Sequence, residues 1–128
     1  MFTADVGSPT VWAARYLSMT ENRRLIGSFT HGSMANALLH GIGAQVSHPD
    51  RQVIALAGDG GLAMMLGELL TLTQNKLPVK TIVVNNSSLN FVELEMKAAG
   101  FVNYGTALDN PSFAAIAEAM GILSLIHI

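Results

Sequence analysis

Two polar groups follow two apolar stretches of this 128-residue chain, and together they could bind a cation and its phosphates. The first is Gly58-Asp59-Gly60-Gly61 and the second is Asn85-Asn86. The segment from Leu62 to Val84 should form one helix and one strand, which puts both groups at the carboxyl ends of parallel strands. One carboxylate and one amide oxygen are too few to hold a divalent ion alone. They suffice for Mg²⁺ when the phosphates of a ligand complete its octahedron.

Strands and helices that alternate along the chain would position these groups. Strands are expected at Phe2–Val6, Arg24–Phe29, Gln52–Ala57 and Pro78–Val84. Helices are expected from Ser8 to about Leu17 and at Ser33–Val46, Leu62–Asn75, Phe91–Lys97 and Pro111–Met120. Ser8 should be an N-cap with Pro9 at the first helical position, and Asn110 should lead into the last helix. Pro78–Val84 is nearly all apolar or β-branched, as expected for a strand buried on both faces. The alternation predicts an α/β fold with a doubly wound parallel sheet.

Length and composition limit the classes of protein that fit. The chain is long enough for one domain. Only 12% of its residues are charged and 50% are hydrophobic, so part of the surface should be covered by other domains or subunits. The net charge of −2 gives no electrostatic case for binding nucleic acid. No apolar run approaches the length of a membrane helix, and no signal segment precedes Phe2, so a cytoplasmic protein is expected.

Several sequence blocks carry a resemblance to a known family. The segment from Gly58 to Asn86 is similar to the thiamine-diphosphate signature that opens with GDG and closes with NN. Asp5–Trp12, His31–Ala37 and Glu93–Gly100 resemble the third domain of the pyruvate oxidase group, and most of all its bacterial, flavin-linked, quinone-reducing pyruvate dehydrogenases. The resemblance runs from Phe2 to about Ile122. It implies a C-terminal domain that binds thiamine diphosphate and Mg²⁺, within an enzyme that also binds FAD and converts pyruvate to acetate and CO₂.

The resemblance also implies roles for residues of the signature. Asp59 and Asn86 would bind Mg²⁺ through their side chains, and Ser88 through its main-chain carbonyl. Gly60 and Gly61 would let backbone N–H groups approach the diphosphate at a helix N-terminus. Asp59 also fits a simple helix N-cap. The residues implied to contact the cofactor are Gly32, Ser33, Met34, Asp59, Gly60, Gly61, Asn86, Ser87, Ser88, Leu89, Asn90, Phe91 and Val92.

Two of these residues are implied to act in catalysis. Gly32-Ser33-Met34 would meet the aminopyrimidine ring, and Met34 would be the apolar wedge that bends the cofactor. Taken alone, Met34 would be read as a core methionine. Phe91 lies where the quinone-linked enzymes carry a mobile aromatic residue, and it fits a helix-anchoring core phenylalanine equally well. Asn90 stands where that group usually has a glycine.

Partners and competing functions follow from the same resemblance. It implies pyruvate as substrate, a quinone as electron acceptor, and a homotetramer whose active site is shared between subunits. Contact with the inner face of the cell membrane would come from a further C-terminal segment. Without the flavin domain and a glutamate of an N-terminal domain, this chain should not turn over pyruvate. The alternatives are an acetolactate synthase or oxygen-using pyruvate oxidase, and a non-catalytic Mg²⁺/nucleotide-binding module.

The two ends of the sequence differ from the rest. Met1–Asp5 begins within an expected strand, as if cut from a longer chain. Leu123–Ile128 resembles the translation of a transposase-type sequencing adapter, although an ordinary apolar strand is the alternative. We therefore expect a cofactor-binding domain at residues 1–122 and a non-native tail at 123–128, and His127 is given no functional weight.

Overall fold

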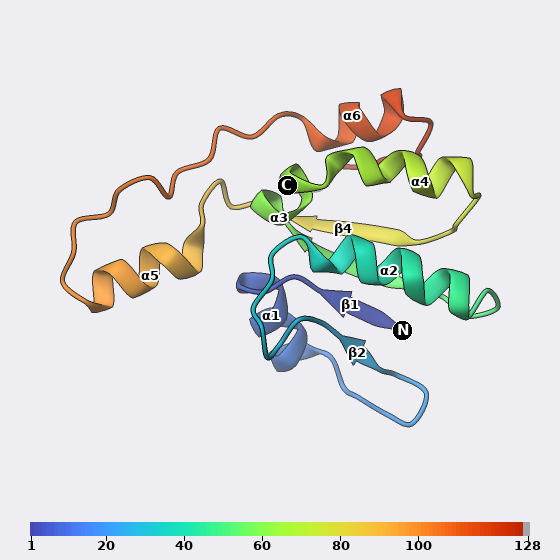
Figure 1. Ribbon diagram of the computed structural model, residues 1–128, viewed down its shortest axis with the longest axis horizontal. Helices are drawn as coiled ribbons and strands as arrows, with labels where there is room; N and C mark the ends of the chain where they lie inside the picture. Colours follow the sequence, from blue (N-terminus) through green and yellow to red (C-terminus); the bar gives the residue numbers. More distant parts are fainter. Residues whose placement is uncertain (127–128) are drawn as a thin grey trace.

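A parallel sheet forms the centre of the computed structural model, which describes residues 1–126 and therefore leaves His127 outside the described part (Figure 1). Its strands are β1 (Phe2–Ala4), β2 (Leu25–Ile26), β3 (Ile54–Gly58) and β4 (Lys80–Val84). They lie in the order β2-β1-β3-β4, and every neighbouring pair is parallel. This arrangement confirms the α/β fold class.

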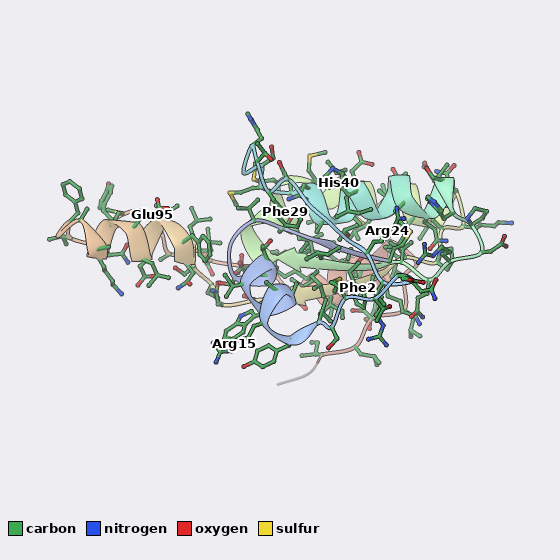
Figure 2. The ribbon with its side chains drawn as sticks, turned by 90° about the horizontal axis from the view of Figure 1, so that it is seen from below. Phe2, Arg15, Arg24, Phe29, His40 and Glu95 are labelled. Atoms are coloured by element: carbon green, nitrogen blue, oxygen red, sulfur yellow. The ribbon has the colours of Figure 1, made fainter. Side chains whose placement is uncertain are left out.

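Helices cover both faces of the sheet. They are α1 (Ser8–Tyr16), α2 (Asn36–Ser47), α3 (Asp59–Met64), α4 (Leu69–Gln74) and α6 (Phe113–Ala119), whereas α5 (Asn90–Ala98) projects away from the sheet. In Figure 2 the sheet is seen with α2 on one side, near the label of His40, and α1 on the other, near the label of Arg15. The sheet is therefore doubly wound, as the alternation of elements predicted.

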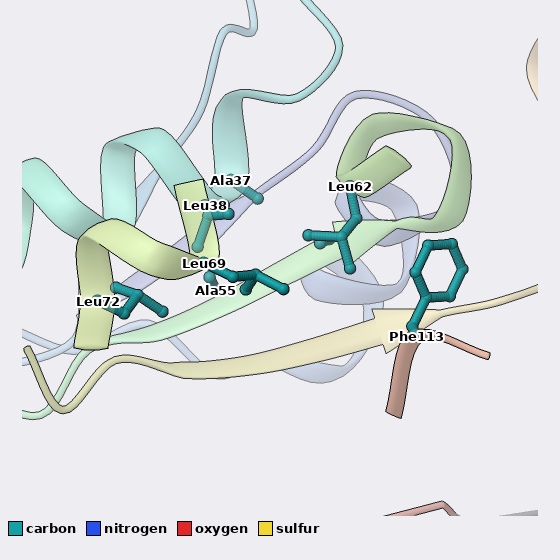
Figure 3. Packing of buried hydrophobic residues seen from close by; sticks show 8 residues of the cluster. Ala37, Leu38, Ala55, Leu62, Leu69, Leu72 and Phe113 are labelled. Carbon is teal, nitrogen blue, oxygen red and sulfur yellow. The ribbon is translucent and has the colours of Figure 1, made fainter. Parts of the chain in front are cut away.

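The hydrophobic core lies between the sheet and the helices on the α2 face. Along β3 buried and partly exposed residues alternate, so Ala55 and Ala57 point into this core. The buried cluster, most of which is labelled in Figure 3, consists of Ala37, Leu38, Ala55, Ala57, Leu62, Leu69, Leu72 and Phe113. Residues of α2, α3, α4 and α6 thus pack on one face of the sheet and hold the starts of α2 and α3 near the ends of the strands.

The single helix expected at Leu62–Asn75 is wrong. The structure has α3, then a 3₁₀ turn at Leu66–Glu68, and then α4. Met65, between α3 and the 3₁₀ turn, has φ −126° and ψ 32°, which lie outside the helical region. Gly67 weakens the helix at this point. In α4, Leu69 and Leu72 are buried, whereas Leu70 is exposed.

Strand β4 is not buried on both faces, so that prediction is also wrong. It lies at the edge of the sheet, and Ile82 at its middle is 51% exposed. Ile82 pairs with Leu56 of β3, so the two side chains share the face of the sheet that α1 covers. The contacts of α1 are with β1 and β3. The apolar composition of β4 therefore does not mean that this chain covers it.

Three helix starts also differ from the prediction. Ser8 is the first residue of α1 instead of its cap, because Gly7, with φ 105°, precedes it. Helix α2 begins at Asn36 instead of Ser33, since Ala35 adopts a left-handed conformation with φ 61°. Helix α6 begins at Phe113, and its cap is Ser112, whose Oγ accepts a hydrogen bond from Ala115 N at 3.3 Å. These shifts leave residues 33–35 and Asn110 in loops.

Some apolar side chains are exposed away from the core. Trp12 and Tyr16 stack on the outer side of α1 with ring centroids 5.8 Å apart. Helix α5 projects from the body of the molecule (Figures 1 and 2), and the loop after it exposes Val102 and Tyr104. Within residues 1–126, no helix has the length and apolar character needed to cross a membrane.

Candidate functional site

A cavity of about 310 Å³ opens at the carboxyl ends of the strands. Each strand contributes the segment that follows it, which is where α/β sheets bind ligands. The lining residues are Asp5, Val6, Gly7, Ser8 and Pro9 after β1, Gly32 and Met34 after β2, Gly58, Asp59, Gly60 and Gly61 at the end of β3, and Val84, Asn86, Ser88, Leu89, Asn90, Phe91, Val92 and Glu95 after β4.

Most residues selected from the sequence line this one cavity. Of the set implied to contact the cofactor, only Ser33 and Ser87 are not among its lining residues. Ser33 lies in the adjacent loop, where its N–H donates to Ser28 Oγ at 3.2 Å. The N–H of Ser87 donates to Asp59 Oδ2 at 2.7 Å. These two residues therefore shape the loops of the site without facing its interior.

Asp59 is a buried carboxylate with an organised set of donors. It is the first residue of α3, and its Oδ1 accepts from the N–H of Gly60 at 2.9 Å. Its Oδ2 accepts from Ser87 N and from Asn110 Nδ2, both at 2.7 Å. Asp59 is not the N-cap of α3, which is Gly58, so the alternative of simple capping does not describe its contacts. Its side chain instead joins two distant segments.

The loop after β4 folds back on itself beside Asp59. Asn86 Oδ1 accepts from Ser88 N at 3.1 Å, and Asn85 Oδ1 accepts from Ser87 N at 3.2 Å. Ser87 has φ 55°, a conformation that non-glycine residues rarely adopt and that these bonds stabilise. Ser88 Oγ donates to Glu93 Oε2 at 2.7 Å, which ties the loop to α5. Asp59, Asn86 and Ser88 therefore all stand at the same cavity.

Two glycines beside Asp59 make close contacts with neighbouring segments. A Cβ added at Gly60 would lie 3.0 Å from Leu89 Cδ2 and 3.3 Å from the tip of Met34. A Cβ added at Gly61 would overlap the carboxylate of Asp5. The start of α3 therefore packs closely against Leu89, Met34 and Asp5, and both glycines line the cavity.

Met34 and Phe91 both face the cavity instead of the hydrophobic core. Met34 is 40% exposed and Phe91 is 39% exposed, and neither belongs to the buried cluster. The alternative interpretation, in which Met34 and Phe91 pack in the hydrophobic core, therefore does not fit this structure. The specific roles of wedge and mobile aromatic residue stay predictions.

Asp5 is a site residue that the sequence reasoning missed. Its Oδ1 accepts from Ala37 N at 2.8 Å and its Oδ2 from Gly58 N at 3.0 Å, so it joins the end of β1 to the start of α2 and the end of β3. Burial raises the pKa of the Asp5 carboxyl above its usual range, although the N–H groups around it act in the opposite direction. The sequence contained a signal for Asp5, because this residue directly follows β1 in the same way that Asp59 directly follows β3.

Two asparagines were also missed. Asn36 orders the turn that holds Met34: its Nδ2 donates to Ser33 O at 2.8 Å, and its Oδ1 accepts from Ser28 N at 3.3 Å. Asn110, read from the sequence as a helix entry, instead contacts Asp59 and Asn85. Asn36 is inside the block that resembles the family, whereas nothing in the sequence around Asn110 pointed to Asp59.

The donor set fits a hard cation only together with a ligand. Among the residues that the structure describes, no three histidine, cysteine or acidic side chains gather in a way that could hold a metal. Asp59, Asn86 and Ser88 offer a carboxylate, an amide oxygen and a main-chain carbonyl around one opening. Oxygen ligands of this kind suit Mg²⁺, provided that phosphate oxygens and water complete the octahedron. Gly60 and Gly61 at the start of α3 line the same cavity, where such phosphates would bind.

Fold and site define a diphosphate-binding α/β domain, and comparison with known proteins specifies it. Residues 5–127 match the family described as thiamine pyrophosphate enzyme, C-terminal TPP binding domain. The chain belongs to this family. It is 39% identical over 121 residues to YdaP of Bacillus subtilis, which its name describes as a thiamine pyrophosphate-containing protein. It is 36% identical to the acetolactate synthase large subunit of Porphyra purpurea and 34% identical to that of isozyme 2 of Escherichia coli.

These matches cover most of this chain but a small part of each relative. In each of the three, 94% of the chain aligns, and the aligned part is 21 or 22% of the relative's length. The family therefore establishes a domain of a thiamine-diphosphate-dependent enzyme. None of these three names specifies a quinone-linked pyruvate dehydrogenase, so the family does not establish that activity for this chain.

Proposed function

We propose that this chain binds thiamine diphosphate with Mg²⁺ in the cavity at the strand ends, as part of an enzyme that oxidatively decarboxylates pyruvate to acetate and CO₂. The observation that supports it best is the convergence of Asp59, Asn86 and Ser88 on one cavity that Gly60 and Gly61 also line. When bound, the cofactor would serve as the electron sink for loss of CO₂ from a 2-oxo acid.

The chain's own residues would bind and orient the cofactor. Asp59 and Asn86 would hold the cation with their side-chain oxygens, and Ser88 with its carbonyl. The backbone at the start of α3 would donate to the diphosphate. Met34, whose tip lies beside Gly60, would press against the middle of the cofactor and hold it bent. Phe91 and Val92 of α5 would form the apolar wall that keeps water from the reacting centre.

The rest of the proposal concerns the whole enzyme. We propose FAD as a second cofactor, a quinone as electron acceptor, and a homotetramer whose subunits share the active site. A cytoplasmic protein that meets the inner face of the membrane is part of the same proposal. The support is the similarity of His31–Ala37 and Glu93–Gly100 to the quinone-linked enzymes, together with the exposed apolar surfaces of α1 and α5.

A second candidate is acetolactate synthesis, which also begins with decarboxylation of pyruvate. The names of two relatives favour it, because they are large subunits of acetolactate synthase. A product assay on the complete enzyme separates the two functions. Acetate with stoichiometric reduction of a quinone analogue supports the first function, whereas acetolactate formed from two molecules of pyruvate supports the second.

The cation site is tested by titrating thiamine diphosphate into the protein with and without Mg²⁺. Asp59→Ala removes the only carboxylate among the proposed ligands. Because outer-shell partners alone account for about 10- to 100-fold in metal affinity, loss of this ligand should cost more than about 100-fold. Asn86→Asp should be milder, since it retains an oxygen ligand. The matched control is Asp50→Ala, an exposed carboxylate in the turn after α2. Equal cofactor affinity in wild type and Asp59→Ala would contradict the site.

A further inference from the structure

We propose that Asn110 is a positioning residue that fixes Asp59 relative to the Asn86 loop and thereby sets the preference of the site for Mg²⁺ over larger cations. This inference rests on the proposed function, because it concerns the same cation. Asn110 does not line the cavity and is not among the proposed ligands. It would act through the ligand that it holds.

The contacts of Asn110 join the two segments that supply the ligands. Its Nδ2 donates to Asp59 Oδ2 at 2.7 Å and to Asn85 Oδ1 at 3.0 Å. Asp59 directly follows β3 and Asn85 directly follows β4. Ser87 N donates to the same two side-chain oxygens. The Asn110 amide, together with Ser87 N, therefore holds the carboxylate ligand against the loop that carries the other two ligands.

The position of Asn110 is itself fixed on both sides. Before it, Leu108 N donates to Ser87 O at 2.9 Å, and Leu89 N donates to Thr106 O at 2.8 Å, so this returning segment pairs with the loop after β4. After it, Phe113 is buried in the core cluster. The side chain of Asn110 is thus held by the fold on either side, as a positioning residue must be.

The chemistry of an amide suits this place. Its two N–H groups can serve two acceptors, and it is neutral, so it adds no charge beside the carboxylate of Asp59. Two donors bind Asp59 Oδ2, whereas Oδ1 accepts only from Gly60 N in the described structure. A carboxylate oxygen can accept two bonds, so Oδ1 keeps a direction for a cation. Asn110 therefore leaves the ligand oxygen open while it holds the other one.

Geometry is what distinguishes the two alkaline-earth ions. Mg²⁺ requires near-ideal octahedral geometry at short distances, whereas Ca²⁺ accepts longer and less regular coordination. If Asn110 is removed, Asp59 keeps its charge but loses one of the bonds that orient it. The loss should therefore fall mainly on Mg²⁺. A residue that only stabilised the fold would change the affinities for both ions alike.

The test is calorimetric titration of Mg²⁺ and, separately, Ca²⁺ into the protein at saturating thiamine diphosphate. Asn110→Ala should raise the Kd for Mg²⁺ by about 10- to 100-fold and that for Ca²⁺ by clearly less. Asn110→Ser retains one donor and should fall between wild type and Asn110→Ala. It also keeps the test available if the alanine variant does not fold. The matched control is Ser112→Ala, which removes the cap of α6 two residues away without touching Asp59.

The outcomes separate this inference from the function on which it rests. If wild type fails to bind Mg²⁺ with thiamine diphosphate, the proposed function is wrong. If wild type binds and either Asn110 variant keeps the full Mg²⁺/Ca²⁺ preference, the inference alone is wrong. An equal loss of affinity for Mg²⁺ and Ca²⁺ in Asn110→Ala would mean that Asn110 only supports the fold, and would overturn the proposal. The same loss of Mg²⁺ affinity in Ser112→Ala would overturn it too.

Discussion

The carboxylate of Asp5 and the backbone of Gly61 are in direct contact at the floor of the cavity. A Cβ at position 61 would overlap Asp5 Oδ2 and lie 3.0 Å from Asp5 Cγ and 3.1 Å from Ala35 N. Because Asp5 also joins β1 to α2 and β3, the absence of a side chain at Gly61 lets three elements meet there. Stability and site geometry are therefore linked at this contact.

Gly61→Ala should lower the free energy of unfolding by about 1–3 kcal/mol, the usual cost of overpacking. The added methyl group must displace either the Asp5 carboxylate or the start of α2. The matched control is Gly43→Ala in α2, where an added Cβ meets nothing within 4 Å. That change should be neutral or stabilising by up to about 1 kcal/mol. Urea unfolding of both variants is the measurement, and an unchanged midpoint for Gly61→Ala would contradict the tight contact.

Met34→Ala should slow removal of the C2 proton of the bound cofactor more than it weakens cofactor binding. The diphosphate contacts near Asp59 and Gly60 would remain, whereas the position of the reacting centre would loosen, which can cost orders of magnitude in rate. Because Met34 lies outside the core cluster, stability should change much less than the roughly 2–5 kcal/mol typical of a buried methionine. Hydrogen exchange at C2, followed by quenched-flow NMR in the complete enzyme, measures the rate. Unchanged exchange would remove Met34 from the site.

Titration of Asp5 should make stability depend on pH in a direction opposite to that of most acidic residues. Burial raises its pKa in the folded state, so the folded protein binds this proton more tightly than the unfolded chain. The resulting stability is fully present below the unfolded pKa, about 3.9, and is lost as the pH rises through the folded value. The free energy of unfolding of wild type relative to Asp5→Asn should therefore fall across that window.

Glu93 provides the internal contrast to Asp5. Hydrogen bonds from Lys97 and Ser88 lower the pKa of Glu93, so its contribution is present above its unfolded pKa and is lost as the pH falls through the folded value. Wild type relative to Glu93→Gln should thus lose stability toward acid, where wild type relative to Asp5→Asn gains it. Slopes of the same sign for the two pairs, measured by urea unfolding at a series of pH values, would contradict the assignment for Asp5.

Deleting residues 123–128 should leave the melting temperature unchanged or slightly higher. Leu123 is 91% exposed, Leu125 and Ile126 are exposed as well, and no strand forms over the described part of this segment. Ile122, which packs against the core, marks where the deletion should stop. The control is a deletion that also removes Ile122, which should lower the melting temperature. Strong amide protection at Leu125 or Ile126 in hydrogen exchange would instead indicate native structure.

The sequence predicted the parts of this fold that depend on local pattern and on the topology of parallel strands. Asp59 and Asn86 were brought to one cavity because the ends of adjacent parallel strands meet at one edge of the sheet. The same reasoning would have found Asp5, which also follows a strand. It could not have found Asn110, because the contact with Asp59 joins residues 51 positions apart and depends on how the returning segment pairs with the loop after β4.

The errors in the elements have equally specific causes. The segment Leu62–Asn75 was expected to form one helix, but the chain leaves the helical conformation at Met65 and passes through a 3₁₀ turn before α4 begins. The composition of Pro78–Val84 described how much of the strand is apolar and not what covers it, so the exposure of Ile82 was missed. In both cases the conformation or burial of a segment depends on the residues that pack against it in the folded chain, which the segment's own sequence does not reveal.

The pairing of Ser88 with Ala107 means that the chain leaves the body of the molecule and re-enters it at nearly the same point. The arm between them, which carries α5, is therefore a projecting loop whose two ends are paired at its base (Figure 1). Changes in its length or tilt would move Phe91 and Val92 while Asp59 and Asn86 stay in place. If Phe91 and Val92 form the apolar wall proposed above, that wall could be reshaped while the proposed cation ligands Asp59 and Asn86 keep their places.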